Sequence, residues 1–349
     1  MTLKSTFELC GKPLDGSVPP LIVAEIGFNH NGQPALAEAM IQSAAEHGAD
    51  LVKLQTFRGA ELYAQSFRAL DPDHPGTTIP FYKFWQRYEL PPEAYRRLFD
   101  MARDLGVPLF STPFDLESLR MLVDLGLPAI KIASGDLTYT DLLKEAGATG
   151  LPVVLSSGMA TEAELAAALE VLEGAGAQEV LLLHCVSHYP AEPEEMNLAC
   201  LPYLRERFGV PVGLSDHTLQ ATSALTATAL GAVMIEKHFT TDCHLPGVDQ
   251  ALSMEPRDLK RLKDAVGEVH RTLGRPVKEP QPAELETRRG ARRSLVARRA
   301  IARGTVITAD LLACKRPGTG IPAERAGEVI GRTARADIPA ETLLSWDQF

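Results

Sequence analysis

Eight short apolar runs, separated by helical patterns, constrain the fold of this chain more than any other feature. The runs occupy residues 21–27, 51–56, 108–114, 129–134, 153–158, 180–186, 210–216 and 232–239. Most are nearly continuous in apolar residues, which is typical of parallel strands that are covered on both faces. Between them, residues 34–49, 93–106 and 161–176 carry apolar residues at spacings of three and four, which indicates helices.

Eight strand–helix alternations predict a (β/α)8 TIM barrel over residues 1–275. A doubly wound open sheet is the alternative, but no glycine-rich turn of the dinucleotide-binding type follows the first run. Residues 276–290 are rich in Pro and charge and predict a linker, and residues 291–349 predict a small β-rich domain. The connection 57–90 is too long for an ordinary loop, so we expect a functional lid there.

Composition excludes several classes of protein. The formal net charge is -10, which argues against broad binding of nucleic acid or of anionic membranes. No segment approaches the roughly 20 apolar residues of a membrane helix, and the first residues contain no apolar run of a signal peptide. The five cysteines are scattered without a CxxC pair, as expected for free thiols in a reducing compartment. We therefore expect a cytoplasmic protein.

Charged residues inside the apolar runs point to a shared polar site. In a barrel of this type the chemistry lies at the carboxyl ends of the strands. Glu25, Lys53, Lys131 and Glu236 come from four different runs that are otherwise apolar. Because burying an unpaired charge is costly, we expect these four side chains to meet in one site, although a structural ion pair between any two remains an alternative.

Two histidines follow neighbouring runs at equivalent positions. A single His is more often a satisfied core residue than a metal ligand. His217 and His238 could instead converge on one divalent cation, and with oxygen ligands completing the shell Mn²⁺ or Mg²⁺ would fit better than a closed zinc site. The spacing alone leaves both interpretations open.

Lysine and hydroxyl side chains at the ends of other runs suggest an anion. Lys131 offers a point charge, and Ser134, Ser156 and Ser215 offer hydroxyl donors that could surround a phosphate. Lys53 could bind a carboxylate, so a substrate with both groups is plausible.

Several motifs together resemble the sialic acid synthase family. They are VAEIGFNHNG (23–32), VKLQTF (52–57), FSTPFD (110–115), KIASGD (131–136), LSSGM (155–159), HCVSHYP (184–190), GLSDH (213–217) and IEKHF (235–239). Residues 292–321, RRSLVARRAIARGTVITADLLACKRPGTGI, resemble that family's antifreeze-like (SAF) domain, a β-clip. The resemblance runs in order over nearly the whole chain.

The resemblance implies an activity. Members of the family condense phosphoenolpyruvate with N-acetylmannosamine or a related amino sugar, giving a nine-carbon 2-keto acid and phosphate. They require a divalent cation, for which we expect Mn²⁺, with Mg²⁺ or Co²⁺ as alternatives. They form domain-swapped homodimers, in which the small domain of one chain covers the barrel mouth of the other.

The resemblance also assigns roles to residues. The metal ligands are His217 and His238. The phosphate-binding positions are Lys131, Ser134, Ser156 and Ser215. Phosphoenolpyruvate also contacts Lys53, and the other substrate-binding positions are Gln55, Ser187 and Tyr189. Glu25 is the carboxylate proposed to activate water, and the polar positions around the sugar and metal are Asp136, Glu236 and Asp249. Arg316 reaches from the small domain to the acyl group of the sugar in the partner's site.

Several alternatives stay open at this point. The acceptor could be N-acetylmannosamine, its 6-phosphate, as in a sialic acid 9-phosphate synthase, or the diamino sugar that leads to legionaminic acid. KIASGD resembles the sialic and legionaminic branch more than the pseudaminic branch. Another phosphoenolpyruvate-condensing barrel, making a seven- or eight-carbon keto acid, is disfavoured by the antifreeze-like tail. A catalytically silent sugar-binding barrel is disfavoured by the intact set of charged residues and histidines.

Overall fold

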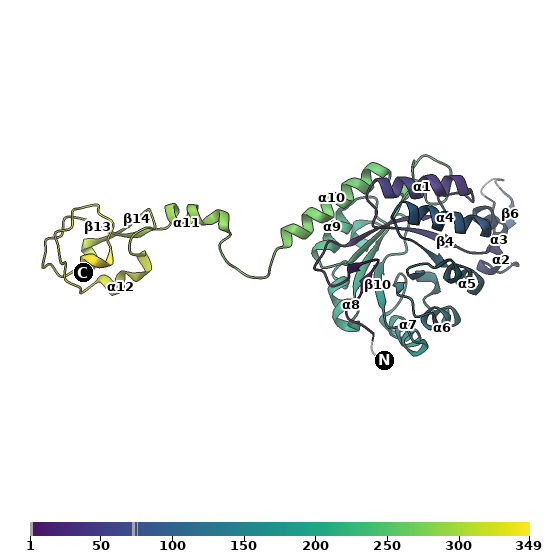
Figure 1. Cartoon of the computed structure of the whole chain (residues 1–349), viewed down its shortest axis with the longest axis horizontal. Coiled ribbons are helices and arrows are strands. Elements are labelled where there is room, and N and C mark those ends of the chain that lie inside the picture. The colour runs from purple at the N-terminus through teal and green to yellow at the C-terminus, as the bar shows by residue number, and fades with distance from the viewer. Residues whose placement is uncertain (1–2, 72–73, 75) are drawn as a thin grey trace. The chain divides into compact units, whose positions relative to one another are not determined.

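The computed structural model describes residues 3–71, 74 and 76–349. It divides the chain into two compact units, one that ends at Gly274 and one that runs from Arg275 to Phe349. Figure 1 labels the helices and strands of both units.

The first unit is a closed barrel of eight parallel strands (Figure 1). Each strand pairs with the next one along the chain, and the last pairs with the first, so that His238 lies opposite Glu25. The strands are β3 (Leu21–Gly27), β4 (Leu51–Thr56), β7 (Leu109–Pro113), β8 (Ile130–Ile132), β9 (Val153–Ser156), β10 (Val180–Cys185), β11 (Val212–Asp216) and β12 (Met234–His238). All eight lie within the predicted apolar runs, and the predicted (β/α)8 barrel is confirmed.

Eight main helices alternate with these strands. They are α1 (Pro34–Glu46), α4 (Pro92–Asp104), α5 (Leu116–Leu125), α6 (Thr140–Ala148), α7 (Glu162–Ala175), α8 (Cys200–Phe208), α9 (Thr222–Ala229) and α10 (Pro256–Leu273). Local chemistry fixes several of their ends. Thr161 and Glu164 form a reciprocal capping box at the start of α7, and Gly176 ends that helix in the left-handed conformation.

The core has an outer and an inner part. The outer part packs the outward side chains of the strands against the helices, for example Ile22 and Leu54 against Met40 and Leu98. The inner part lies inside the barrel near the starts of the strands. There an N-terminal hairpin of β1 (Glu8–Leu9) and β2 (Lys12–Pro13) brings apolar side chains against the barrel interior. This end of the barrel is therefore filled, and a site can open only at the carboxyl ends of the strands.

The long connection after β4 has structure of its own. It contains α2 (Gly59–Leu62), β5 (Arg68–Leu70), β6 (Thr78–Pro80), α3 (Phe81–Trp85) and a 3-10 turn (Gln86–Tyr88). Strands β5 and β6 form a separate antiparallel hairpin. Aromatic side chains from the connection pack together, and they also contact Phe28 and Phe114 through Phe57 and Trp85.

The second unit has a small core around an antiparallel pair of strands. Its elements are α11 (Leu285–Ala291), β13 (Ser294–Ala297), β14 (Leu312–Lys315) and α12 (Ala326–Val329). Leu295, Ile307 and Leu344 are among the fully buried residues of this core. Helix α11 overlaps the end of the predicted linker, residues 276–290, because residues 285–291 contain neither Pro nor a β-branched run.

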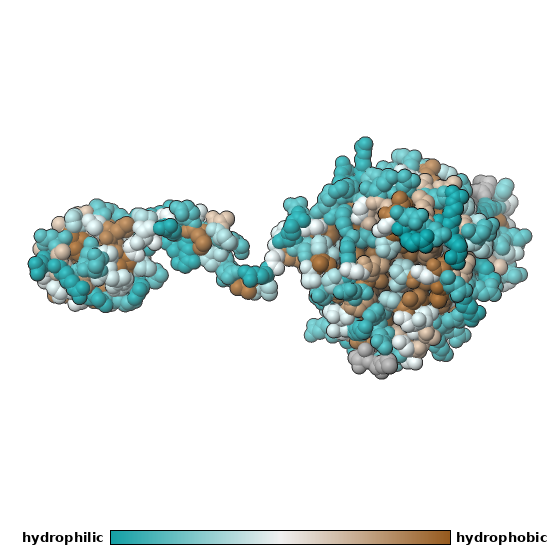
Figure 2. Space-filling model, viewed as in Figure 1, coloured by the Kyte–Doolittle hydropathy of each residue, from teal (hydrophilic) through white to brown (hydrophobic). Residues whose placement is uncertain are grey.

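The visible surface of each unit is largely hydrophilic (Figure 2), and the cysteines are not paired. Hydrophilic residues cover most of the visible face of each unit in Figure 2. Among the described residues, no helix combines the length and apolar character needed to cross a membrane. All five cysteines are free. The remaining 3-10 turns are Ser134–Asp136, Pro193–Glu195, Gln250–Leu252, Pro282–Glu284, Ala309–Leu311, Ala323–Arg325 and Trp346–Gln348.

Candidate active site

A cavity of about 630 Å³ opens at the carboxyl ends of the barrel strands. Every site residue predicted in the first unit lines it except Asp136. These residues are Glu25, Lys53, Gln55, Lys131, Ser134, Ser156, Ser187, Tyr189, Ser215, His217, Glu236, His238 and Asp249. The barrel therefore brings together side chains that are up to about two hundred positions apart in the sequence.

Four buried charges form a network at the floor of the cavity. Lys53 Nζ lies 2.6 Å from Glu25 Oε2 and 3.7 Å from Glu236 Oε1. Lys131 Nζ lies 3.7 Å from the same oxygen of Glu236. All four side chains are at most 5% exposed, so each ion pair lies in a medium that screens it weakly. The expected shared polar site exists, and the ion-pair alternative is also realised within it.

The network pushes the pKa values of the two carboxyls apart. Burial raises the pKa of Glu25, and this effect exceeds the opposing attraction of Lys53. Burial acts in the same sense on Glu236, but Lys131 and Lys53 together outweigh it and hold the pKa of Glu236 low. Carboxyls with separated pKa values can take separate roles, with Glu236 a fixed anion and Glu25 able to exchange a proton.

The two lysines differ in the same way. Burial opposes the charge of Lys53, but Glu236 and Glu25 outweigh it, so its pKa is raised. Burial lowers the pKa of Lys131 by more than Glu236 raises it. The neighbouring carboxylates therefore stabilise the charge of Lys131 less than that of Lys53. This difference favours Lys131 as the group that binds an additional anion.

Hydroxyl groups surround Lys131 and Lys53. Lys131 Nζ donates to Ser156 Oγ at 2.6 Å, and Lys53 Nζ donates to Thr112 Oγ1 at 3.1 Å. Ser215 Oγ donates to Glu236 Oε1 at 3.1 Å. All of these residues line the cavity, and lysine and hydroxyl side chains are groups that can bind a phosphate.

The backbone at Gly158 approaches this group closely. Its N–H donates to Ser134 Oγ at 2.9 Å. A Cβ at this position would lie 2.2 Å from Ser187 Oγ and 2.7 Å from Ser134 Oγ, so only glycine allows both hydroxyls to stay where they are.

His217 and His238 lie side by side, with ring centroids 5.5 Å apart. His217 Nδ1 lies 2.8 Å from the carbonyl oxygen of Val186, a contact that assigns the proton to Nδ1 and leaves Nε2 with a free lone pair. His238 Nδ1 is buried without a hydrogen-bond partner, 3.7 Å from Asp249 Oδ2. The unpartnered Nδ1 of His238, the neighbouring imidazole of His217 and the carboxylate of Asp249 are a donor set that fits a divalent cation with oxygen co-ligands.

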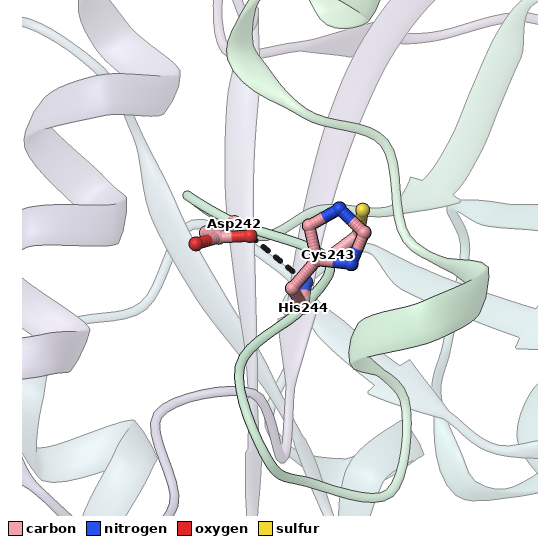
Figure 3. A group of neighbouring side chains, drawn as sticks. All are labelled: Asp242, Cys243 and His244. Atoms are coloured by element: carbon pink, nitrogen blue, oxygen red, sulfur yellow. Dashed lines mark hydrogen bonds between the residues drawn. The ribbon is translucent and has the colours of Figure 1, made fainter.

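The three neighbouring residues in Figure 3 form a different cluster of donor atoms. Asp242, Cys243 and His244 are consecutive, and their donor atoms lie within 4.8 Å of one another. Asp242 Oδ1 already accepts the backbone N–H of His244 at 2.8 Å, which is an ordinary turn within the exposed loop. Within the part of the chain that the structure describes, no other three His, Cys, Asp or Glu side chains bring their donor atoms this close together. This group does not include the predicted metal ligands.

Two predicted site residues lie elsewhere. Asp136 ends the short turn after β8, where burial raises its pKa to about 6 against the attraction of Lys131. One of its carboxylate oxygens is buried without a partner. Arg316 is exposed and belongs to the second unit, next to the end of β14. The roles assigned to both residues stay predictions.

The sequence analysis missed one side of the cavity. Phe28, Tyr63, Trp85, Phe114 and Met159 line it but were not predicted. No spacing rule selects them, because aromatic residues of a long connection have no fixed period. Cys185 was also missed, although it ends β10 and its Sγ lies 3.9 Å from His217 Nδ1.

Comparison with known proteins gives the family. Residues 40–278 match the model of the NeuB family, and residues 292–349 match the SAF domain. The chain belongs to the NeuB family. The resemblance to the sialic acid synthases and the assignment of the tail to an SAF domain are both confirmed.

Similar members of the NeuB family are named for different products. The N,N'-diacetyllegionaminic acid synthase of Campylobacter jejuni is 37% identical, over 93% of this chain and 98% of its own length. The pseudaminic acid synthase of Helicobacter pylori is also 37% identical, over 94% of this chain and 97% of its own length. Among solved structures, the N-acetylneuraminic acid synthetase of Leptospira borgpetersenii in complex with citrate has a TM-score of 0.74 at 31% identity, over 82% of this chain and 96% of the other. Equal identity to two synthases does not select an acceptor sugar.

Proposed function

We propose that this chain condenses phosphoenolpyruvate with an open-chain amino sugar, giving a nine-carbon 2-keto acid of the sialic acid type and releasing phosphate. The buried network of Glu25, Lys53, Lys131 and Glu236 carries the proposal, because it places two cations and two dissimilar carboxyls in one cavity. The names of the similar synthases support the same activity.

The two lysines would position phosphoenolpyruvate. Lys131, with the serine hydroxyls around it, would bind the phosphate, and Lys53 would bind the carboxylate. Holding both ends of this small substrate fixes carbon 3 against the aldehyde carbon of the sugar, which is catalysis by positioning. A divalent cation, for which we propose Mn²⁺, would be held by His217 and His238 and would polarise the aldehyde when bound.

Glu25 would complete the reaction. Carbon 3 of phosphoenolpyruvate forms the new bond to the aldehyde carbon as the C=O double bond opens. The aldehyde oxygen takes up a proton from water and becomes a hydroxyl, and positive character is left at carbon 2. Water adds at carbon 2 and gives its proton to Glu25, whose pKa is raised by burial, so that it holds a proton more readily than an exposed carboxylate. The resulting intermediate expels phosphate by cleavage of the carbon–oxygen bond.

Isotope labelling tests this route. The bridging oxygen of phosphoenolpyruvate is labelled with ¹⁸O, and the label is expected to leave with phosphate. Label that stays in the sugar acid would contradict carbon–oxygen cleavage and the role given to Glu25.

The basic test of the function is phosphate release from phosphoenolpyruvate with Mn²⁺ and three acceptors in parallel: N-acetylmannosamine, its 6-phosphate and the diamino analogue of the legionaminic type. We expect release with one of them that a chelator abolishes. Sugar binding without release would instead indicate a silent sugar-binding barrel.

We also propose that the protein is a cytoplasmic homodimer in which Arg316 completes the partner's site, and the charge distribution supports the pairing of a barrel with a second unit. Residues 275–349 contain fourteen Lys and Arg and nine Asp and Glu, whereas the whole chain has a net charge of -10. The second unit is therefore basic and the barrel acidic, so a barrel and a second unit attract each other. Light scattering coupled to size exclusion is expected to give twice the mass of one chain, and a monomer at working concentration would contradict the proposal.

A further inference from the structure

The cavity has two chemically different sides. Its floor carries the charged network at the strand ends. Its other side is an aromatic wall, which we define as Phe28, Tyr63, Trp85 and Phe114. The ring centroids of Phe28 and Trp85 are 4.6 Å apart, and the rings of Tyr63 and Trp85 are nearly parallel at 6.1 Å.

The aromatic wall is held in place by close packing of the long connection. A Cβ on Gly59 would lie 2.5 Å from the carbonyl oxygen of Tyr82, and a Cβ on Gly32 would lie 2.3 Å from that of Arg87. Both glycines let backbone segments approach where a side chain would not fit. Phe57 packs edge-on against Phe28 from behind, at 5.3 Å. A wall packed in this way is preformed for a ligand, which lowers the ordering cost of binding.

The wall offers rings and no cation. Among the described residues that line the cavity, the only lysines are Lys53 and Lys131, and there is no arginine. Both lysines lie at the floor within hydrogen-bond or ion-pair reach of Glu25, Glu236 or Ser156. Trp85 lines the cavity, and its indole N–H is buried. Ring faces carry negative potential and repel a phosphate, but they attract methyl groups.

We propose that the aromatic wall is a subsite for the apolar substituents of the acceptor, which is a doubly acylated, unphosphorylated amino sugar. This inference rests on the proposed function and specifies its acceptor. Each methyl group buried against the wall improves binding about fourfold, so an acetyl methyl and a deoxy methyl together improve it by about tenfold or more. A sugar 6-phosphate would place its charge against rings, at a side of the cavity where the described lining residues of this chain provide no cation.

Fluorescence of Trp85 gives a test that needs no turnover. The chain contains two tryptophans, and Trp346 belongs to the second unit, so the variant Trp346→Phe leaves Trp85 as its single indole. This variant is titrated with N-acetylmannosamine, N-acetylmannosamine 6-phosphate and 2,4-diacetamido-2,4,6-trideoxymannose. We expect a saturable change in emission with the diacetamido sugar at a concentration about tenfold lower than with N-acetylmannosamine, and none with the 6-phosphate.

Kinetics of two variants give the second test. Trp85→Leu removes the wall's largest ring, and the matched control Phe84→Leu removes a ring that packs 5.5 Å from Trp85 but does not line the cavity. We expect Trp85→Leu to reduce the kcat/KM ratio of the diacetamido sugar over N-acetylmannosamine by about fivefold or more, with the KM for phosphoenolpyruvate unchanged. Phe84→Leu should leave the ratio within about twofold of the original.

The outcomes separate this inference from the proposed function. Tighter binding or faster turnover of the 6-phosphate would overturn the subsite, as would turnover without any response of Trp85 or an equal loss of selectivity in both variants. A Trp85 response to the diacetamido sugar without phosphate release from any acceptor would support the subsite and contradict the proposed function.

Discussion

Replacing Lys131 by Met is expected to separate catalysis from stability. In the protein without substrate, burial lowers the pKa of Lys131. The charged form of this side chain is therefore destabilised, and the attraction of Glu236 offsets that effect only in part. Met fills a similar volume without that cost, and Glu236 keeps Lys53 at 3.7 Å and the hydroxyl of Ser215 at 3.1 Å. We therefore expect the free energy of unfolding to change by less than about 1.5 kcal/mol.

The same substitution should be severe for the reaction. A phosphate bound at the cavity floor would lose its principal cation in a buried setting, where removal of one partner of a charged pair costs about 3–4 kcal/mol. At 1.36 kcal/mol per tenfold, this corresponds to a loss of roughly two to three orders of magnitude in kcat/KM for phosphoenolpyruvate. Initial rates of phosphate release against phosphoenolpyruvate concentration, with urea unfolding of the same samples, measure both quantities.

Lys237 provides the matched control. It is a buried lysine on β12, next to Glu236 in the sequence. Its Nζ lies 3.0 Å from Asp216 Oδ2, and it does not line the cavity. Lys237→Met leaves Asp216 buried without its cation, so we expect a loss of about 3 kcal/mol of stability. The kinetics of the molecules that remain folded should be nearly unchanged. A Lys131→Met variant with less than a tenfold loss in kcat/KM, or with the stability loss expected of Lys237→Met, would refute the assignment of Lys131 to phosphate.

Three further perturbations have defined outcomes. Dialysis against a chelator should abolish phosphate release and Mn²⁺ should restore it, whereas His217→Ala should not be rescued at the same Mn²⁺ concentration; activity that survives chelation would contradict the metal site. Burial lowers the pKa of His30 to about 4, below its value of about 6.5 in the unfolded chain, so this residue contributes stability above pH 6.5 that is lost as the pH falls toward 4. Between pH 7.5 and 5, wild type should lose about 2 kcal/mol more than His30→Gln in urea unfolding, and parallel curves would refute the role of His30. Gly158→Ala should raise the KM for phosphoenolpyruvate about tenfold or more, because its Cβ would displace the hydroxyls of Ser134 and Ser187, and a lower temperature of unfolding with an unchanged KM would contradict this reasoning.

Periodicity and strand-end chemistry predicted the barrel and most of its site. Parallel strands covered on both faces must be apolar along most of their length, so the eight runs were visible in the sequence. Because all carboxyl ends of such strands meet at one end of a barrel, Glu25, Lys53, Lys131 and Glu236 could be assigned to one site before their distances were known. The tail was recognised through its resemblance to a known domain, and its composition alone indicated only a small β-rich unit.

Tertiary structure decided which way these residues face and which of them pair. Glu236 and Lys237 are adjacent and equally buried, yet Glu236 lines the cavity and Lys237 pairs with Asp216 away from it. Alternation along a strand gives the two faces but not which one points inward, since that depends on the tilt and register of all eight strands. The aromatic wall depends on a loop whose path no period constrains, so Trp85 could be placed in the cavity only by the packed structure. The sequence alone thus determined the barrel and the chemistry available at its mouth, and the three-dimensional packing decided how those groups are paired and oriented.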